Sequence, residues 1–121
     1  MRLLVCDDEE QYRRAELIFR RETAGQGVWL ASTVLVEVVW VLSVAYKFER
    51  AITAASLRRL IDTDGVHVED GPTTRLVLAA FEAGAADFAD YFIWESARRD
   101  GALPLYTIDE RLSRSNGAKL V

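Results

Sequence analysis

Amphipathic stretches of helical length alternate along the chain with short runs of apolar residues. Apolar positions at helical spacing predict a helix over Asp8–Arg21, in which Tyr12, Ala15 and Phe19 share one face and Asp8 is the cap. The same spacing predicts further helices at residues 34–46, 53–62, 72–82, 87–100 and 109–114. Short apolar runs predict strands at residues 28–31, 66–68, 103–107 and 118–121.

The order of these elements predicts the class of fold. Strands separated by helices indicate a parallel sheet with right-handed crossovers, which is a three-layer α/β domain. Ligands of such sheets bind at the carboxyl ends of the strands. Asp109 directly follows one predicted strand, so we expect it at a ligand site.

An acidic residue interrupts the most apolar stretch of the chain. From Val34 to Tyr46 every residue is apolar except Glu37 and Ser43. A helix this apolar is expected in the core, with Ser32 or Thr33 as its cap. A buried carboxylate costs several kcal/mol unless it is paired or bound to a metal, so Glu37 is expected to meet a cation.

Composition indicates one cytoplasmic domain over residues 1–121. The chain has 121 residues, half of them hydrophobic, and only two Pro, which suits one folded core. The apolar run around Glu37 is short and contains a charge, so no membrane span is expected. No secretory signal is visible, and the single Cys6 has no disulfide partner, which fits a reducing compartment.

Charge narrows the possible partners. The net charge of −4 argues against broad, nonspecific binding of nucleic acid but is compatible with a nuclease whose metal site is acidic. Paired arginines such as Arg13-Arg14 and Arg98-Arg99 suit phosphate binding. For each single pair, however, a solvated helix face is the preferred interpretation.

Acidic residues also gather in the last third of the chain. Asp87 and Asp90 are spaced to share one helix face, and Asp109 follows the next strand. Each could be only a helix cap, where acids are common. Their convergence with Glu37 would require a hard divalent cation, so the sequence predicts a Mg²⁺ or Mn²⁺ site. No Cys/His cluster suggests zinc, and His67, between two Val, is expected to be structural.

Four segments in order resemble the PIN-domain ribonucleases, and in particular the VapC-type toxins of bacterial toxin–antitoxin systems. They are RLLVCDDEEQYRRAELIFRRE, LVEVVWVL, GADFADYFIWESAR and LYTIDERL. The resemblance implies a Mg²⁺-dependent endoribonuclease in which Glu37, Asp90 and Asp109 bind the metal and act in catalysis. Asp87 is expected at the edge of the site, holding a water or a second ion.

The same resemblance implies partners. VapC-type toxins act on RNA, bind a cognate antitoxin protein whose peptide lies near the active groove, and form homodimers. Trp40, Phe92 and Trp94 are large enough to anchor such interfaces, although core packing is the commoner fate of each.

The chain departs from the family pattern at its start. The family opens with a central strand that ends in Asp-Thr-Asn, whose Asp is a metal ligand, and the chain begins after that motif. Without the first strand and its acid, we expect weak Mg²⁺ binding and impaired cleavage. Alternatively, Leu3–Cys6 is the first strand, and Asp7 or Asp8 replaces the acid.

Two other classes fit parts of the sequence. LLVCDDEE resembles the start of a signalling receiver domain, but no Asp follows Asp8 before Asp62, and Lys119 lacks the expected context. The remaining alternative is a catalytically inactive PIN-like binding module that dimerises or binds an antitoxin peptide.

Overall fold

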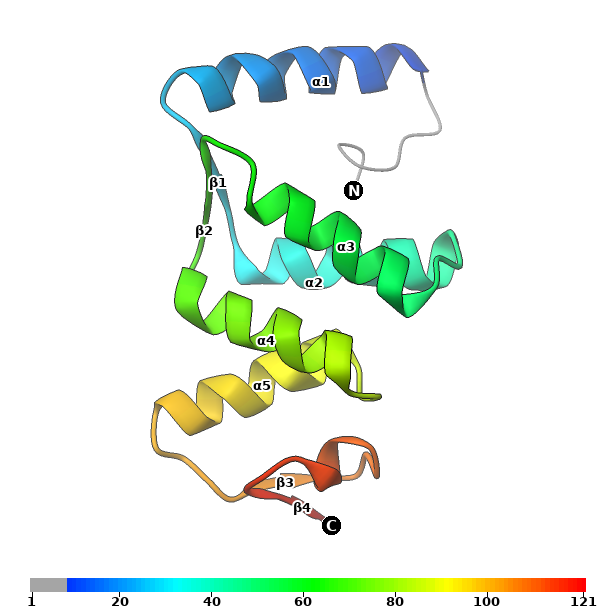
Figure 1. Ribbon diagram of the computed structural model, residues 1–121, viewed down its shortest axis with the longest axis vertical. Helices are drawn as coiled ribbons and strands as arrows, with labels where there is room; N and C mark the ends of the chain where they lie inside the picture. The colour runs from blue at the N-terminus through cyan, green and yellow to red at the C-terminus, as the bar shows by residue number, and fades with distance from the viewer. Residues whose placement is uncertain (1–8) are drawn as a thin grey trace. The chain divides into compact units, whose positions relative to one another are not determined.

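The computed structural model describes residues 9–121, which form a mixed α/β chain (Figure 1). Its elements in order are α1 (Glu9–Ala24), β1 (Val28–Leu30), α2 (Ser32–Trp40), η1 (Val41–Ala45), α3 (Arg50–Ile61), β2 (Val66–Val68), α4 (Gly71–Ala83), α5 (Phe88–Arg99), β3 (Leu105–Thr107), η2 (Leu112–Arg114) and β4 (Ala118–Leu120). The predictions for Leu3–Cys6, Asp7 and Asp8, and for the side chain of Tyr12, fall outside what is described. The chain divides into two compact units at Glu69 and Asp70, and the prediction of a single domain over 1–121 stays a prediction.

In the first unit, β1 and β2 pair in parallel, with Val28 opposite Val66 and Leu30 opposite Val68. Glycine permits the close approach of chain segments at the start of this pair. Gly65 has a φ of +84°, and a Cβ there would lie 2.1 Å from the Thr23 carbonyl oxygen. A side chain at this position would therefore displace the end of α1.

The helix that follows β1 begins differently from the prediction. Its N-cap is Ala31, which has no side-chain hydrogen bond to offer, so the predicted cap by Ser32 or Thr33 is wrong. The Ser32 N–H instead donates to the Glu69 side chain at 3.0 Å. A carboxylate from the end of β2 thus satisfies a free amide at the start of α2.

This helix is also shorter than predicted as an α-helix. It leaves α-helical geometry after Trp40 and continues as one π-helical turn, η1, up to Ala45. Leu35, Val38 and Leu42 are buried along this segment. They are spaced three and four residues apart, so one face of the helix packs in the core.

In the second unit, α4 and α5 pack against each other through aromatic rings. Phe88 lies edge-on to Phe81 at 5.5 Å between ring centroids and to Phe92 at 5.2 Å. Asp70 caps α4 by accepting a hydrogen bond from the Thr73 N–H at 3.3 Å. The Arg99 guanidinium, at the end of α5, pairs with the same carboxylate.

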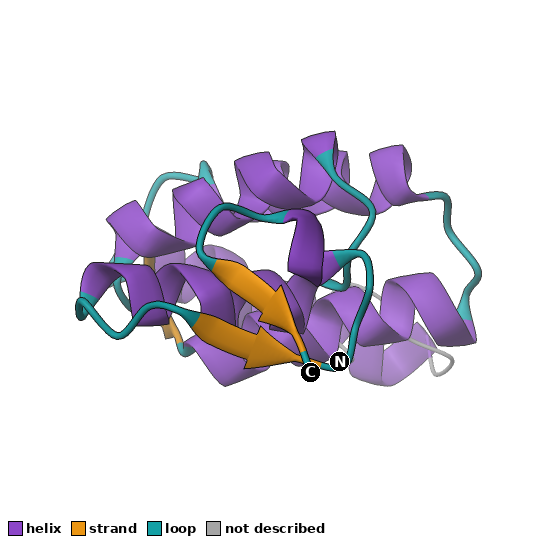
Figure 2. Cartoon of the chain, turned by 90° about the horizontal axis from the view of Figure 1, so that it is seen from below, coloured by secondary structure: helices purple, strands orange, loops and turns teal. Residues whose placement is uncertain are grey.

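The second strand pair is anchored to α5. β3 and β4 run parallel, as the paired arrows in Figure 2 show, with Tyr106 opposite Lys119. The Trp94 indole N–H donates to the Asn116 carbonyl at 2.9 Å, which holds the turn before β4 on the helix. The position of Asp109, just beyond β3, is therefore fixed relative to α5 within this unit.

The strands form two separate two-stranded sheets, β1–β2 and β3–β4. The predicted mixture of helices with parallel strands is confirmed, whereas the residues described do not form one continuous sheet. Within residues 9–121 no third strand joins either pair, so the outer edge of each strand is unpaired. Val28 and Leu30 direct their backbone bonds toward β2, and Leu105 and Thr107 direct theirs toward β4. The amides of the middle residues, Trp29 and Tyr106, therefore face away from the partner strand.

No helix among residues 9–121 combines the length and the apolar character that a membrane crossing requires.

Candidate metal centre

Two acids stand at the beginning of α5. Asp87 occupies the N-cap position with extended backbone, at φ −71° and ψ 151°, yet its side chain makes no capping hydrogen bond. Asp90 lies in the first turn of the same helix. Asp87 therefore occupies the N-cap position that the sequence offered as an alternative, but its carboxylate makes no capping bond to the helix.

Asp109 comes from the turn after β3 and is held by three local hydrogen bonds. Its N–H donates to the Thr107 hydroxyl at 3.0 Å. Its Oδ1 accepts from the N–H of Arg111 at 2.7 Å and from that of Leu112 at 3.1 Å. Asp109 therefore does act as a cap, but only one carboxylate oxygen is used. The backbone of the turn fixes the direction in which the other oxygen points.

The three carboxylates converge. One oxygen from each of Asp87, Asp90 and Asp109 lies within 4.8 Å of the other two. Asp87 is exposed and the other two are half-buried. Oxygen ligands of one Mg²⁺ are at most roughly 4 Å apart, because each lies about 2.1 Å from the ion. Small side-chain rotations would bring the group to that spacing.

The electrostatics of the cluster favour a cation. Burial raises the pKa of Asp90 above its usual range, and the negative charges of Asp87 and Asp109 raise it further. Among the described residues, no ion pair joins a Lys or Arg to any of the three carboxylates. A bound divalent ion would relieve this repulsion and would favour the ionised form of Asp90.

The prediction that Glu37 is a buried carboxylate is wrong, because its side chain is exposed. Leu35, Val38 and Val39 are buried on the core face of α2, and Glu37 lies on the other face. The buried acid of the described chain is Glu95 on α5, 5% exposed, with the Arg98 guanidinium 3.7 Å away. Glu37 belongs to the first unit, and its convergence with Asp90 and Asp109 stays a prediction.

The three aromatic residues considered as interface anchors differ in how exposed they are. Phe92 is buried in the aromatic core of its unit, so it is not a surface anchor. Trp94 is half-buried and hydrogen-bonded to Asn116, and the Arg98 guanidinium lies 5.8 Å from its ring centroid. Trp40 is 59% exposed and remains available for a partner.

Two further side chains, those of His67 and Arg111, make contacts that the sequence does not predict. His67 is exposed on β2, and a Cβ on Gly27 would lie 2.9 Å from its ring, so the ring covers that glycine. Arg111, two residues after Asp109, donates from its guanidinium to the Ala85 carbonyl at 3.4 Å. The one local signal for this contact is the position of the arginine, two residues after Asp109 in the turn that follows β3.

Comparison with protein-family models, with curated proteins and with solved structures finds no match for this chain.

Proposed function

We propose that the chain is a PIN-like, Mg²⁺- or Mn²⁺-dependent endoribonuclease of the VapC toxin type. The observation that supports this most strongly is the convergence of Asp87, Asp90 and Asp109. Carboxylates from a helix start and from a strand end are brought together without a neutralising cation. Such a group suits a hard divalent ion. The choice of RNA as substrate follows from the family resemblance, and the choice of the cytoplasm as the place of action follows from the single Cys6 and the lack of a visible secretory signal.

The three acids would have different roles in metal binding. Asp90 and Asp109 would hold the metal, and Asp87, which is more exposed, would hold a water or a second ion at its edge. A bound Mg²⁺ would supply an activated water and would stabilise charge on the phosphoryl group. The Arg111 and Leu112 amides fix Asp109 in advance, which limits the loss of side-chain entropy on metal binding.

The family resemblance also implies a further metal-binding Asp at the end of a first strand. We propose that adding a strand that ends in Asp ahead of Met1 would strengthen the metal site. Without an acid in that place, weak Mg²⁺ binding and poor RNA cleavage are expected.

The test combines metal binding with cleavage of a single-stranded RNA. Mg²⁺ should raise the melting temperature of the chain, and the Asp90→Asn variant should lose this response. Adding an upstream strand that ends in Asp should increase cleavage, and Asp90→Asn should remove the gain. Asp100→Asn, an exposed acid beyond the other end of α5, is the matched control and should behave as the parent. Cleavage that does not depend on Asp90 would contradict the proposal.

An inactive PIN-like binding module remains the second candidate, and exposed aromatic residues favour it. Trp40, Val44 and Ile52 are each more than half exposed, and Tyr46 and Phe48 lie edge-on at 6.3 Å beside them in sequence. Large exposed apolar groups often mark protein interfaces. This surface would serve a second copy of the chain or an antitoxin peptide. Light scattering that shows a monomer at micromolar concentration would contradict the homodimer.

A further inference from the structure

We infer that Arg111 binds a phosphate of single-stranded RNA at the rim of the acidic cluster. The inference rests on the proposed function and extends it, because it assigns a contact to the substrate rather than to the metal.

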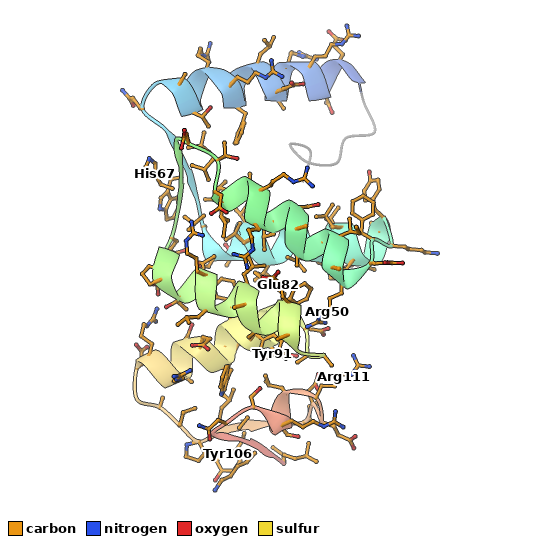
Figure 3. All side chains as sticks on the ribbon, viewed as in Figure 1. Arg50, His67, Glu82, Tyr91, Tyr106 and Arg111 are labelled. Carbon is orange, nitrogen blue, oxygen red and sulfur yellow. The ribbon has the colours of Figure 1, made fainter. Side chains whose placement is uncertain are left out.

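Hydrogen bonds hold both the backbone and the side chain of Arg111. Its backbone N–H donates to Asp109 Oδ1 at 2.7 Å, which ties the residue to a proposed metal ligand. Its guanidinium donates to the Ala85 carbonyl at 3.4 Å, in the loop that leads to Asp87. Figure 3 shows the side chain projecting from its turn toward this loop. The guanidinium therefore bridges the two segments that supply the acids.

The Arg111 guanidinium forms no ion pair with any residue that the structure describes, although carboxylates are near in sequence on both sides. Among the described residues, the Ala85 carbonyl is the partner shown for its side chain. Other exposed arginines of the chain do pair with acids, as Arg20 does with Glu16 at 2.5 Å and Arg99 with Asp100 at 3.0 Å. Arg111 thus keeps its charge, and most of its five N–H donors, for an external anion.

A phosphodiester is the anion that suits both parts of this site. A metal held by the carboxylates would bind one phosphate oxygen, and the planar fork of Arg111 would bind oxygens of the same or the next phosphate. A lone carboxylate or a protein surface would gain from the arginine but not from the acidic cluster. An exposed guanidinium, held by the Ala85 carbonyl beside three acids, therefore favours a nucleic-acid strand.

The test measures RNA binding without cleavage. A fluorescein-labelled single-stranded RNA is titrated with the full chain at several salt concentrations, with Ca²⁺ in place of Mg²⁺ to keep the RNA intact. Arg111→Gln should weaken binding roughly tenfold to a hundredfold, the range for a hydrogen bond to a charged group. The plot of log affinity against log salt should become shallower by about 0.7, because one phosphate contact is lost. A merely structural role for Arg111 would not change this slope.

Two further variants make the result specific. Arg111→Lys keeps the charge and loses the fork, so it should retain the salt slope and recover part of the affinity. Arg114→Gln removes an exposed arginine from the adjacent η2 turn and should leave both quantities unchanged. Equal affinity and slope for Arg111→Gln and Arg114→Gln, or no RNA binding by the parent chain, would overturn the inference.

The outcome separates the inference from the proposed function. Cleavage that depends on Asp90 but RNA binding that ignores Arg111 would reject the phosphate contact alone. RNA binding that depends on Arg111, with cleavage that ignores Asp90, would reject the metal-dependent reaction and leave the phosphate contact standing.

Discussion

The helices α2 and α5 both contain acids among apolar residues, and the structure treats these acids in opposite ways. On α2, Glu37 is surrounded in sequence by Val and Leu, yet its side chain is exposed. On α5, Glu95 lies in a mixed stretch rich in charges and is 5% exposed. It follows Phe88, Tyr91 and Phe92 at helical spacing on the face that packs against α4.

These two acids show that the residues next to an acid in the sequence do not determine whether its side chain is buried. A helix buries one face, so the phase of a residue relative to the core is what counts. In an all-apolar run the sequence does not show which face of the helix is buried, because apolar residues occupy every face. In α5 the polar residues outline the buried stripe, and Glu95 falls within it.

The strongest test of this difference concerns the stability of α2. Leu35 is fully buried, so Leu35→Ala should lower the free energy of unfolding by about 2–5 kcal/mol. Glu37→Ala, two residues away on the exposed side, should change it by less than ~0.5 kcal/mol. Urea denaturation of both variants measures the two values. A large decrease in the free energy of unfolding for Glu37→Ala would instead indicate that Glu37 is buried, as the sequence predicts.

The next test concerns the activity of Glu37. The family resemblance predicts that Glu37 is a metal ligand. On that hypothesis, Glu37→Gln should reduce Mg²⁺-dependent cleavage on the order of a hundredfold, which corresponds to ~2.7 kcal/mol. Cleavage is measured on a chain extended by a strand that ends in Asp. Glu49→Gln, an exposed acid at the start of α3, is the control. Unchanged cleavage in Glu37→Gln would limit the site to Asp87, Asp90 and Asp109.

A smaller effect should distinguish the acids at the starts of α4 and α5. Asp70 caps α4, and hydrogen bonding from Thr73 with the charge of Arg99 lowers its pKa. Asp70→Ala should therefore cost ~1 kcal/mol of stability at neutral pH, whereas Asp87→Ala, which loses no capping bond, should cost less than ~0.5 kcal/mol without metal.

The pH dependence of this difference has a definite sign. Because folding lowers the pKa of Asp70, its contribution is present above the unfolded-state pKa of about 3.9 and is lost as the pH falls through the folded-state pKa. Thermal melts of Asp70→Ala and the parent should thus converge in acid. A constant gap at all pH values would contradict the role of its charge.

The smallest expected effect is a gain in stability. The pKa of Asp90 is raised, so its ionised form is unfavourable in the folded state, and stability falls as the pH rises through that pKa. Asp90→Asn should raise the melting temperature at pH 7 without metal by about 2 °C, and the difference should vanish in acid. With Mg²⁺ the order should reverse, because only the parent binds the ion. A lower melting temperature for the variant without metal would show that Asp90 serves the fold.

Local patterns predicted most of the elements but not their association. Residues 66–68 form a strand as expected, and Pro72 and Gly84 mark the limits of α4 to within a residue. These signals act within a few residues, where backbone preferences dominate. The division into two strand pairs could not be predicted in this way, since pairing joins segments such as Val28 and Val66 that are far apart in sequence.

The candidate site shows the same limit. Asp87 and Asp90 share a helix face, and this spacing was enough to relate them. Their approach to Asp109 depends on how β3 is anchored to α5 through Trp94 and Asn116, which no local pattern reveals. The family resemblance suggested that Asp90 and Asp109 lie together. Their carboxylate oxygens lie within 4.8 Å of each other, while their role as metal ligands together with Glu37 stays a prediction.

Along the part of the chain that the structure describes, the outer edges of β1 and β3 are unpaired, which affects how the protein behaves at high concentration. An unpaired edge is a template to which any extended chain can add through main-chain hydrogen bonds, with little demand on its sequence. Each strand is three residues long and presents one outward amide, at Trp29 or Tyr106. Such a short template gives weak, reversible addition and does not sustain fibre growth. Crowding should therefore produce transient association that dilution reverses.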